Sequence, residues 1–162
     1  MNAAVFPGSF DPVTLGHMDV IERAAGLFDR VYICTMVNGG KNPLFTTEQR
    51  FAMLCAAVEG LENVTAELWT GLLADYAREK GARYLVKGVR SATDFDVEFG
   101  MAQINRGIEA SLDTVLLPAQ ARFVHFSSTM VREMIKYAQP LEAYMPAAAI
   151  RLLKGWGNDG EL

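Results

Sequence analysis

Short apolar runs alternate with amphipathic segments along most of the chain. Five runs have the length and composition of strands: Ala3–Phe6, Val31–Val37, Val64–Leu68, Arg83–Lys87 and Thr114–Leu117. Between and after them, apolar residues recur at helical spacing over His17–Phe28, a segment capped by Thr46 or Thr47, Leu72–Lys80, Thr93–Glu109, a segment from Ser127 or Ser128 to Tyr137, and a last one starting at Pro146. This alternation predicts an α/β fold with a doubly wound, five-stranded parallel sheet. With no internal repeat or linker, residues 1–162 are expected to form a single domain.

The loop after the first strand is the most informative stretch. In a doubly wound sheet, ligands bind beyond the carboxyl ends of the strands, so the loops that follow strands matter most. This one, residues 7–16, contains two prolines, two glycines and a serine, and it leads into a helix with His17 in its first turn. Unpaired N–H groups and the helix dipole favour an anion there, which predicts a phosphate or nucleotide site. The alternative is a turn-rich connection whose histidine only caps the helix.

Bulk properties narrow the class of partner. The 162 residues are 51% hydrophobic and 21% charged, with a net charge of −4, which argues against a nucleic acid or an anionic membrane as main partner. A secretory signal and a transmembrane run are not recognised. The two cysteines, Cys34 and Cys55, form no CxxC pair, and we expect two buried free thiols in a cytoplasmic protein.

The standard phosphate-binding motifs do not fit. Gly40-Lys41 is followed by Asn42 rather than by Ser or Thr, which excludes a P-loop. Residues 155–160 match GxGxxG letter by letter, but no helix follows them, so we interpret them as a chance match.

Four segments together resemble one known family. Residues 9–17, which run from Ser9-Phe10 to Gly16-His17, resemble the (T/S)xGH motif of the nucleotidyltransferase superfamily, which has a Rossmann-like fold. With residues 42–46, 88–98 and 127–133, they resemble the bacterial phosphopantetheine adenylyltransferases in order and spacing over nearly the whole chain.

The resemblance implies a reaction and its partners. The family transfers AMP from ATP to 4′-phosphopantetheine, giving dephospho-coenzyme A and pyrophosphate, by direct attack of the substrate phosphate and without a covalent enzyme intermediate. It implies Mg²⁺ bound mainly through the ATP phosphates, inhibition by coenzyme A, and a homohexamer. No protein metal ligand is expected.

The resemblance also implies site residues. The implied catalytic residues are His17, Lys41 and Arg90. The implied ATP-binding residues are Ser9, Phe10, His17, Gly88, Val89, Arg90, Glu98, Phe123, Val124, His125, Phe126, Ser127, Ser128 and Thr129. The implied substrate-binding residues are Ser9, Lys41, Leu73, Lys87, Met101 and Asn105. By themselves, Leu73 reads as a core residue, Lys41 as a solvated loop lysine and His125 as a structural histidine.

Several points stay open at this level. Lys87 stands where the family more often has arginine, which keeps the charge but loses the bidentate fork. Asp94, Asp96 and Glu98 fit either a metal cluster or, as we favour for Asp96, complements to a helix dipole. One N-cap explains one of the hydroxyls of residues 127–129, but not a run of three. The rival functions are another nucleotidyltransferase, acting on nicotinate mononucleotide or a small alcohol phosphate, and a nucleotide-sensing module without activity.

Overall fold

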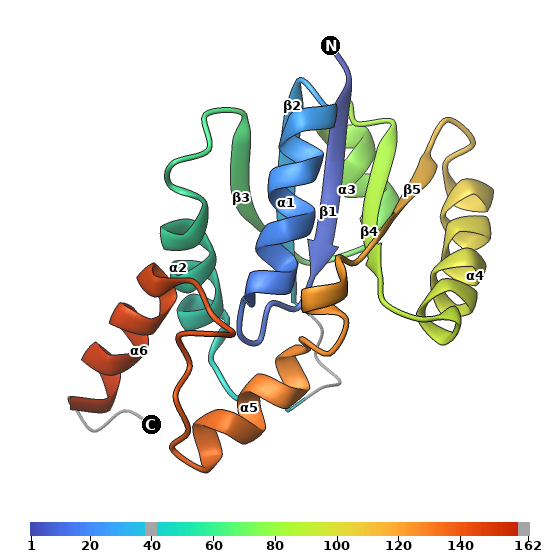
Figure 1. Cartoon of the computed structure of the whole chain (residues 1–162). Coiled ribbons are helices and arrows are strands. Elements are labelled where there is room, and N and C mark those ends of the chain that lie inside the picture. The colour runs from blue at the N-terminus through green and yellow to red at the C-terminus, as the bar shows by residue number, and fades with distance from the viewer. Residues whose placement is uncertain (38–41, 159–162) are drawn as a thin grey trace.

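The computed structural model describes residues 1–37 and 42–158, and it confirms a five-stranded parallel sheet of the Rossmann-like type. The strands are β1 (Ala3–Gly8), β2 (Arg30–Met36), β3 (Val64–Trp69), β4 (Tyr84–Val89) and β5 (Asp113–Pro118). The helices are α1 (Leu15–Leu27), α2 (Thr47–Val58), α3 (Leu73–Glu79), α4 (Ala92–Ile108), the 3₁₀ turn η1 (Ala121–Phe123), α5 (Ser128–Lys136) and α6 (Ala147–Asn158). The strand order β3-β2-β1-β4-β5 puts β1 in the centre, and α5 lies beyond the carboxyl ends of the strands (Figure 1).

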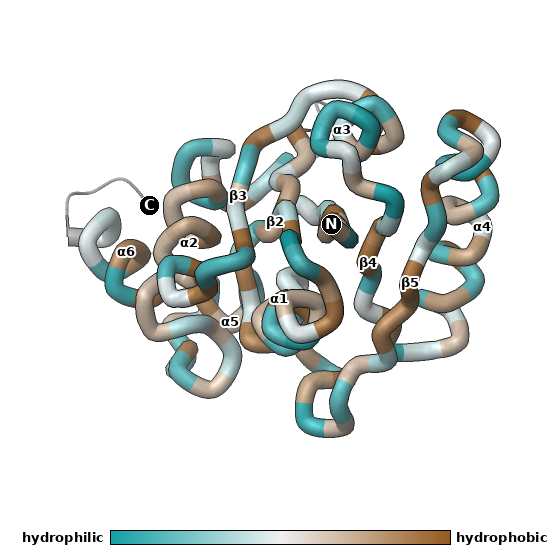
Figure 2. The backbone as a smooth tube through the Cα atoms, turned by 90° about the horizontal axis from the view of Figure 1, so that it is seen from above, coloured by the Kyte–Doolittle hydropathy of each residue, from teal (hydrophilic) through white to brown (hydrophobic). Residues whose placement is uncertain are grey.

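Helices cover both faces of the sheet. Side chains of β1 alternate between two buried clusters, because successive residues of a strand point to opposite faces. Phe6 belongs to the cluster that contains residues of α1, α2, α5 and α6, whereas Val5 belongs to the cluster built with α3. Figure 2 shows α1 and α3 on opposite sides of the strands, with α6 beside α2. The doubly wound arrangement expected from the alternation is therefore confirmed.

The helix boundaries differ from those expected by one or two residues. Helix α1 begins at Leu15 rather than His17 because the Thr14 side chain caps it, accepting the backbone N–H of His17 (3.2 Å). Helix α6 begins at Ala147, and Pro146 is its N-cap rather than its first residue, since its carbonyl accepts the N–H of Ile150. At the end of α3, Gly81 has the left-handed φ of 63° that a helix C-terminus favours, as expected.

The cysteines are only partly as expected. Both are free, but Cys34 is buried in β2 whereas Cys55 is half-buried on α2, so the prediction of two buried thiols was wrong for Cys55. Burial raises the pKa of the Cys34 thiol to about 12, so this thiol stays protonated and unreactive at neutral pH.

The sheet opens between β1 and β4, and this opening positions the site. These two strands pair only at Ala4↔Tyr84 and Val5↔Leu85, whereas β1 stays paired with β2 as far as Gly8↔Thr35. The backbone groups of a strand that point toward one neighbouring strand recur at every second residue. Pro7 follows Val5 by two residues, so its backbone nitrogen faces β4 as the backbone of Val5 does. Because proline has no N–H, it removes the next donor toward β4. The strands therefore diverge where the strand order reverses, which is the place where ligands bind in such sheets.

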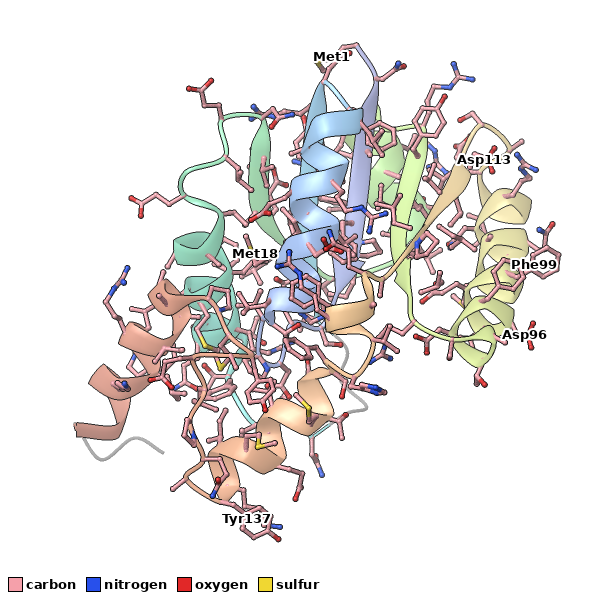
Figure 3. All side chains as sticks on the ribbon, viewed as in Figure 1. Met1, Met18, Asp96, Phe99, Asp113 and Tyr137 are labelled. Carbon is pink, nitrogen blue, oxygen red and sulfur yellow. The ribbon has the colours of Figure 1, made fainter. Side chains whose placement is uncertain are left out.

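Helix α4 has an inverted polarity. Its less exposed positions form a stripe of mostly polar residues: Asp94, Glu98, Ala102 and Asn105. Its large apolar side chains are more than 40% exposed: Phe95, Val97, Phe99, Met101, Ile104 and Ile108. Figure 3 shows Phe99 on the side of α4 that is turned away from the strands. No helix in the described ranges has both the length and the apolarity needed to cross a membrane.

Gly8 provides a test of the packing at the end of β1. A Cβ at this position would lie 2.9–3.1 Å from three ring carbons of Phe10, which is 1% exposed and cannot move aside easily. We expect Gly8→Ala to lower the free energy of unfolding by about 1–3 kcal/mol, the usual effect of overpacking, as measured by urea denaturation.

Gly26→Ala is the matched control, because a Cβ at this helical glycine meets nothing within 4 Å. Its stability should equal or exceed that of the wild type, since alanine favours a helix by about 0.5–1 kcal/mol. A Gly8→Ala variant as stable as the wild type would contradict this account of the turn.

Candidate active site

A cleft of about 430 Å³ lies where β1 and β4 diverge. Its walls come from the turn after β1, the first turn of α1, the end of β4, α4 and the start of α5. Of the residues predicted for the site, twelve line it: Ser9, Phe10, His17, Lys87, Gly88, Arg90, Glu98, Phe123, Phe126, Ser127, Ser128 and Thr129. The loops after the first, fourth and fifth strands therefore meet at one place, as the parallel sheet predicted.

The turn after β1 is held from outside by two arginines. Arg50 of α2 donates from Nη1 to the carbonyl of Ser9 (2.8 Å), and Arg132 of α5 donates from Nη1 to the carbonyl of Asp11 (2.8 Å). The Asp11 carboxylate is itself buried and accepts the backbone N–H groups of residues 44 and 45 (2.9 and 3.0 Å). The segment 44–50 and helix α5, both distant from the turn in sequence, thus fix it.

The donors of the same turn remain available. Within the described part of the chain, the backbone N–H groups of Ser9, Phe10 and Asp11 have no hydrogen-bond partner. Phe10 has a left-handed φ of 47°, which is uncommon for a residue with a side chain and is found mainly at turns and functional sites. Unpaired N–H groups beside a helix N-terminus form a cradle suited to phosphate oxygens.

His17 takes part in the cap of α1 and also lines the cleft. Its Nδ1 accepts the backbone N–H of Thr14 (3.0 Å), which completes a capping box with the Thr14 side chain. Burial, and to a smaller extent the nearby Arg90, lowers the pKa of His17 from 6.5 to about 4. The ring is therefore neutral at pH 7, and because Nδ1 is an acceptor, its proton is on Nε2. Capping the helix through Nδ1 is thus compatible with donating a hydrogen bond from Nε2 to a phosphate.

Two cations at the end of β4 are paired with carboxylates of α4. The Lys87 ammonium lies 3.1 Å from Glu98, and both side chains are about one-fifth exposed. The Arg90 guanidinium lies 2.9 Å from Asp94, whose pKa it lowers through their hydrogen bond. Arg90 also donates to the carbonyl of Phe126 (3.3 Å), so it joins the end of β4 to the loop before α5.

The three hydroxyls at the start of α5 all have protein partners. Ser127 Oγ caps the helix by accepting an N–H of its first turn (3.1 Å). Ser128 Oγ donates to the carbonyl of Pro12 (2.9 Å), and Thr129 Oγ1 accepts from Arg132 (3.0 Å). The run of three, which capping alone did not explain, therefore has structural roles at every position. A role in phosphate binding stays a prediction.

Other predicted residues lie away from this cleft or outside the described ranges. Val89, Val124, His125, Leu73, Met101 and Asn105 do not line it, and Lys41 belongs to the stretch 38–41 that the structure does not describe. Leu73 packs at the edge of the cluster under α3, Met101 is exposed on α4, and Asn105 is buried. Gly88 has a packing role, since a Cβ there would lie 2.9 Å from Val20 Cγ2.

Sequence reasoning missed two arginines of the cleft wall. Arg50 and Arg132 both line the cleft, but only Arg50 leaves a signal in the sequence. It shares the buried stripe of α2 with Leu54 and Val58 at four-residue spacing, where a charged residue is unexpected. Phe51 and Cys55 of the same helix, although apolar, are only half-buried.

No cluster of three or more His, Cys, Asp or Glu side chains suited to a metal ion occurs among the described residues. Asp94 pairs with Arg90 and Glu98 with Lys87, so neither belongs to a metal cluster there. Asp96 points outward from α4 (Figure 3).

Known proteins that resemble this chain are nucleotidyltransferases by name. The cytidylyltransferase-like family matches residues 5–134. A phosphopantetheine adenylyltransferase from Heliobacterium modesticaldum is 40% identical over 98% of this chain and 95% of its own length. One from Symbiobacterium thermophilum is 44% identical over 95% of both. A solved structure of a putative nicotinate-nucleotide adenylyltransferase from Vibrio parahaemolyticus has the same fold, with a TM-score of 0.73, 22% identity and coverage of 97% and 94% of the two chains.

The similarity to these relatives extends over nearly the whole chain rather than over one segment. The chain therefore belongs to the phosphopantetheine adenylyltransferase family of cytidylyltransferase-like nucleotidyltransferases.

Proposed function

We propose that this protein transfers the adenylyl group of MgATP to 4′-phosphopantetheine, giving dephospho-coenzyme A and pyrophosphate. The observation that supports this most strongly is the cleft at the switch point of the sheet. Unpaired N–H groups of residues 9–11, the Nε2–H of His17 and the cations Lys87 and Arg90 all line it. These are donors and positive charges, which suit two phosphate-bearing substrates.

In the proposed step, a phosphate oxygen of 4′-phosphopantetheine attacks the α-phosphorus of ATP in line. A bond forms between that oxygen and the α-phosphorus. The bond from the α-phosphorus to the bridging oxygen of the β-phosphate breaks, and pyrophosphate leaves with the electron pair. Because the substrate supplies the nucleophile, no covalent enzyme intermediate is needed. The protein contributes alignment and stabilisation of the developing charge.

The described residues divide this work. His17 donates from Nε2 to an α-phosphate oxygen, and because its ring is neutral, it does so without giving up a proton. The N–H groups of Ser9 and Phe10 bind the same phosphate region. Arg90 and the start of α5, residues 127–129, bind the β- and γ-phosphates, and Glu98 contacts the ribose or adenine. Lys41 approaches the reacting phosphates in this proposal, on the strength of the family resemblance.

Lys87 is the proposed ligand of the phosphate of 4′-phosphopantetheine. Its pairing with Glu98 (3.1 Å) keeps the ammonium at the cleft wall, and the incoming phosphate competes with that carboxylate for it. The pantetheine arm then extends toward Leu73, Met101 and Asn105. Magnesium enters with the ATP phosphates as part of the substrate, and it keeps most of its own water ligands. Coenzyme A contains both halves of the product, so it inhibits by occupying the same cleft.

We further propose that the chain assembles as a homohexamer in the cytoplasm. The exposed apolar side of α4 supports the association of copies. Val97, Met101, Ile104 and Ile108 recur at spacings of three and four residues, so they form one stripe. An apolar stripe of this kind favours burial against another protein surface. The two free thiols suit a reducing compartment.

Pyrophosphate release tests the proposed reaction. With ATP and Mg²⁺, we expect release with 4′-phosphopantetheine and none above background with nicotinate mononucleotide or glycerol phosphate. Release with one of the competitors alone would contradict the proposed substrate while keeping the reaction class. Nucleotide binding without release from any of the three would favour a sensing module.

His17→Ala tests the proposed donor. We expect the turnover number to fall by about 10²–10³, the usual effect of losing one donor to a transition state. The variant also loses half of the capping box, so we expect it to be less stable by about 0.5–2 kcal/mol.

His17→Asn separates the two effects, because its amide oxygen still accepts the N–H of Thr14. This variant should keep the stability but share the loss of turnover. Near-normal turnover in either variant would show that His17 acts only as a cap.

The assembly is tested at Ile104, which is 56% exposed. By light scattering after size exclusion, the wild type should have six times the chain mass of 17.8 kDa. Ile104→Glu puts a charge into the apolar stripe, so it should give a smaller species with an unchanged circular dichroism spectrum. Gln103→Glu, at an exposed neighbouring position, is the control. A monomeric wild type, or an unchanged mass in Ile104→Glu, would contradict the proposed interface.

A further inference from the structure

Arg50 is a buried arginine in the wall of the cleft. It is only 5% exposed, although it lies in the first turn of α2. Its Nη1 donates to the carbonyl of Ser9 (2.8 Å) and its Nη2 to the hydroxyl of Thr47 (3.0 Å). Its Nε is buried and has no hydrogen-bond partner. Buried donors without partners are rare, and each asks for an explanation.

The charge of Arg50 is also uncompensated within the described residues. Each of the three other cations that line the cleft there has a carboxylate within 4 Å: Lys87 with Glu98, Arg90 with Asp94, and Arg132 with Asp11. No such carboxylate accompanies Arg50. Burial of an ion without a counter-charge costs several kcal/mol. The hydrogen bonds that Arg50 makes within the protein therefore do not by themselves explain a buried charge at this position.

The position of Arg50 links this charge to the cradle. The guanidinium contacts the Ser9 carbonyl, which lies between the N–H of Ser9 and those of Phe10 and Asp11, the donors of the turn without a partner among the described residues. By holding that carbonyl on its own side, Arg50 turns the Phe10 N–H to the opposite side, because the two groups belong to one planar peptide unit. Its contact also supports the left-handed conformation of Phe10, which is the residue after Ser9.

We propose that Arg50 is a positioning residue for phosphate binding: it sets the Ser9–Phe10 turn and supplies the positive charge that an anion at this turn compensates. It acts by holding the turn in place and by the electrostatic attraction of its positive charge. The anions concerned are the phosphate groups of the substrates or of pyrophosphate. This inference rests on the proposed use of the cleft for phosphate transfer, and it concerns one residue that the resemblance did not indicate.

The test measures binding rather than turnover. Isothermal titration with magnesium pyrophosphate and, separately, with adenosine is performed on the wild type, Arg50→Gln, Arg50→Lys and the control Arg151→Gln. The control removes the same charge from an exposed site on α6. We expect Arg50→Gln to weaken pyrophosphate binding by at least about tenfold while the Kd for adenosine changes by less than about twofold. Arg50→Lys keeps the charge but loses the fork, so its loss should be intermediate. Arg151→Gln should bind both probes like the wild type.

Each alternative outcome decides the matter. Unchanged pyrophosphate affinity in Arg50→Gln would overturn the proposal, and so would an equal loss for pyrophosphate and adenosine, which indicates a collapsed cleft. If Arg50→Gln does not fold, Arg50→Lys decides, and it must lose pyrophosphate affinity without losing adenosine affinity. A wild type that binds no pyrophosphate would overturn both this inference and the proposed function. Selective loss in Arg50→Gln, in an enzyme that prefers another phosphate acceptor, would leave the inference standing and overturn only the substrate assignment.

Discussion

The organisation of this molecule depends on one constraint, which is that the turn after β1 must leave its N–H groups unpaired in a folded protein. Polar backbone groups normally find partners, so a turn with several free donors has to be held by its acceptors. Here the carbonyls of Ser9, Asp11 and Pro12 are bound by side chains of α2 and α5. Pro7 removes the donor that would otherwise continue the pairing with β4. The cleft is the consequence of these two arrangements.

The electrostatics of the cleft follow the same logic. Cations gathered around one opening would repel one another, and pairing Lys87 and Arg90 with carboxylates of α4 reduces that repulsion. The inward stripe of α4 is therefore polar, which leaves its apolar residues on the outside. A feature of the site thus explains a feature of the surface. His17 is treated differently: burial beside Arg90 keeps its ring neutral, so it can donate a hydrogen bond without adding to the positive charge.

Much of this could be predicted from the sequence, because it is encoded locally. The apolar runs gave the five strands, the alternation gave the doubly wound sheet, and the glycines and prolines around His17 indicated the principal loop. What could not be predicted depends on contacts between distant segments. Arg132 reaches the carbonyl of Asp11 across 121 positions, and no spacing rule anticipates such a contact. Helix α4 was expected from its periodicity, but its inverted polarity only becomes visible once the sheet is in place.

The chemistry proposed for the cleft depends on His17 facing it as a neutral ring with its proton on Nε2. Nitrogen-15 NMR of the histidine-labelled protein tests this most directly, with the His17 signals assigned by their absence from His17→Asn. We expect an unprotonated Nδ1 and a protonated Nε2 at about pH 7, with no titration of this ring down to about pH 5. A cationic ring at about pH 7, or a neutral ring with its proton on Nδ1, would contradict it.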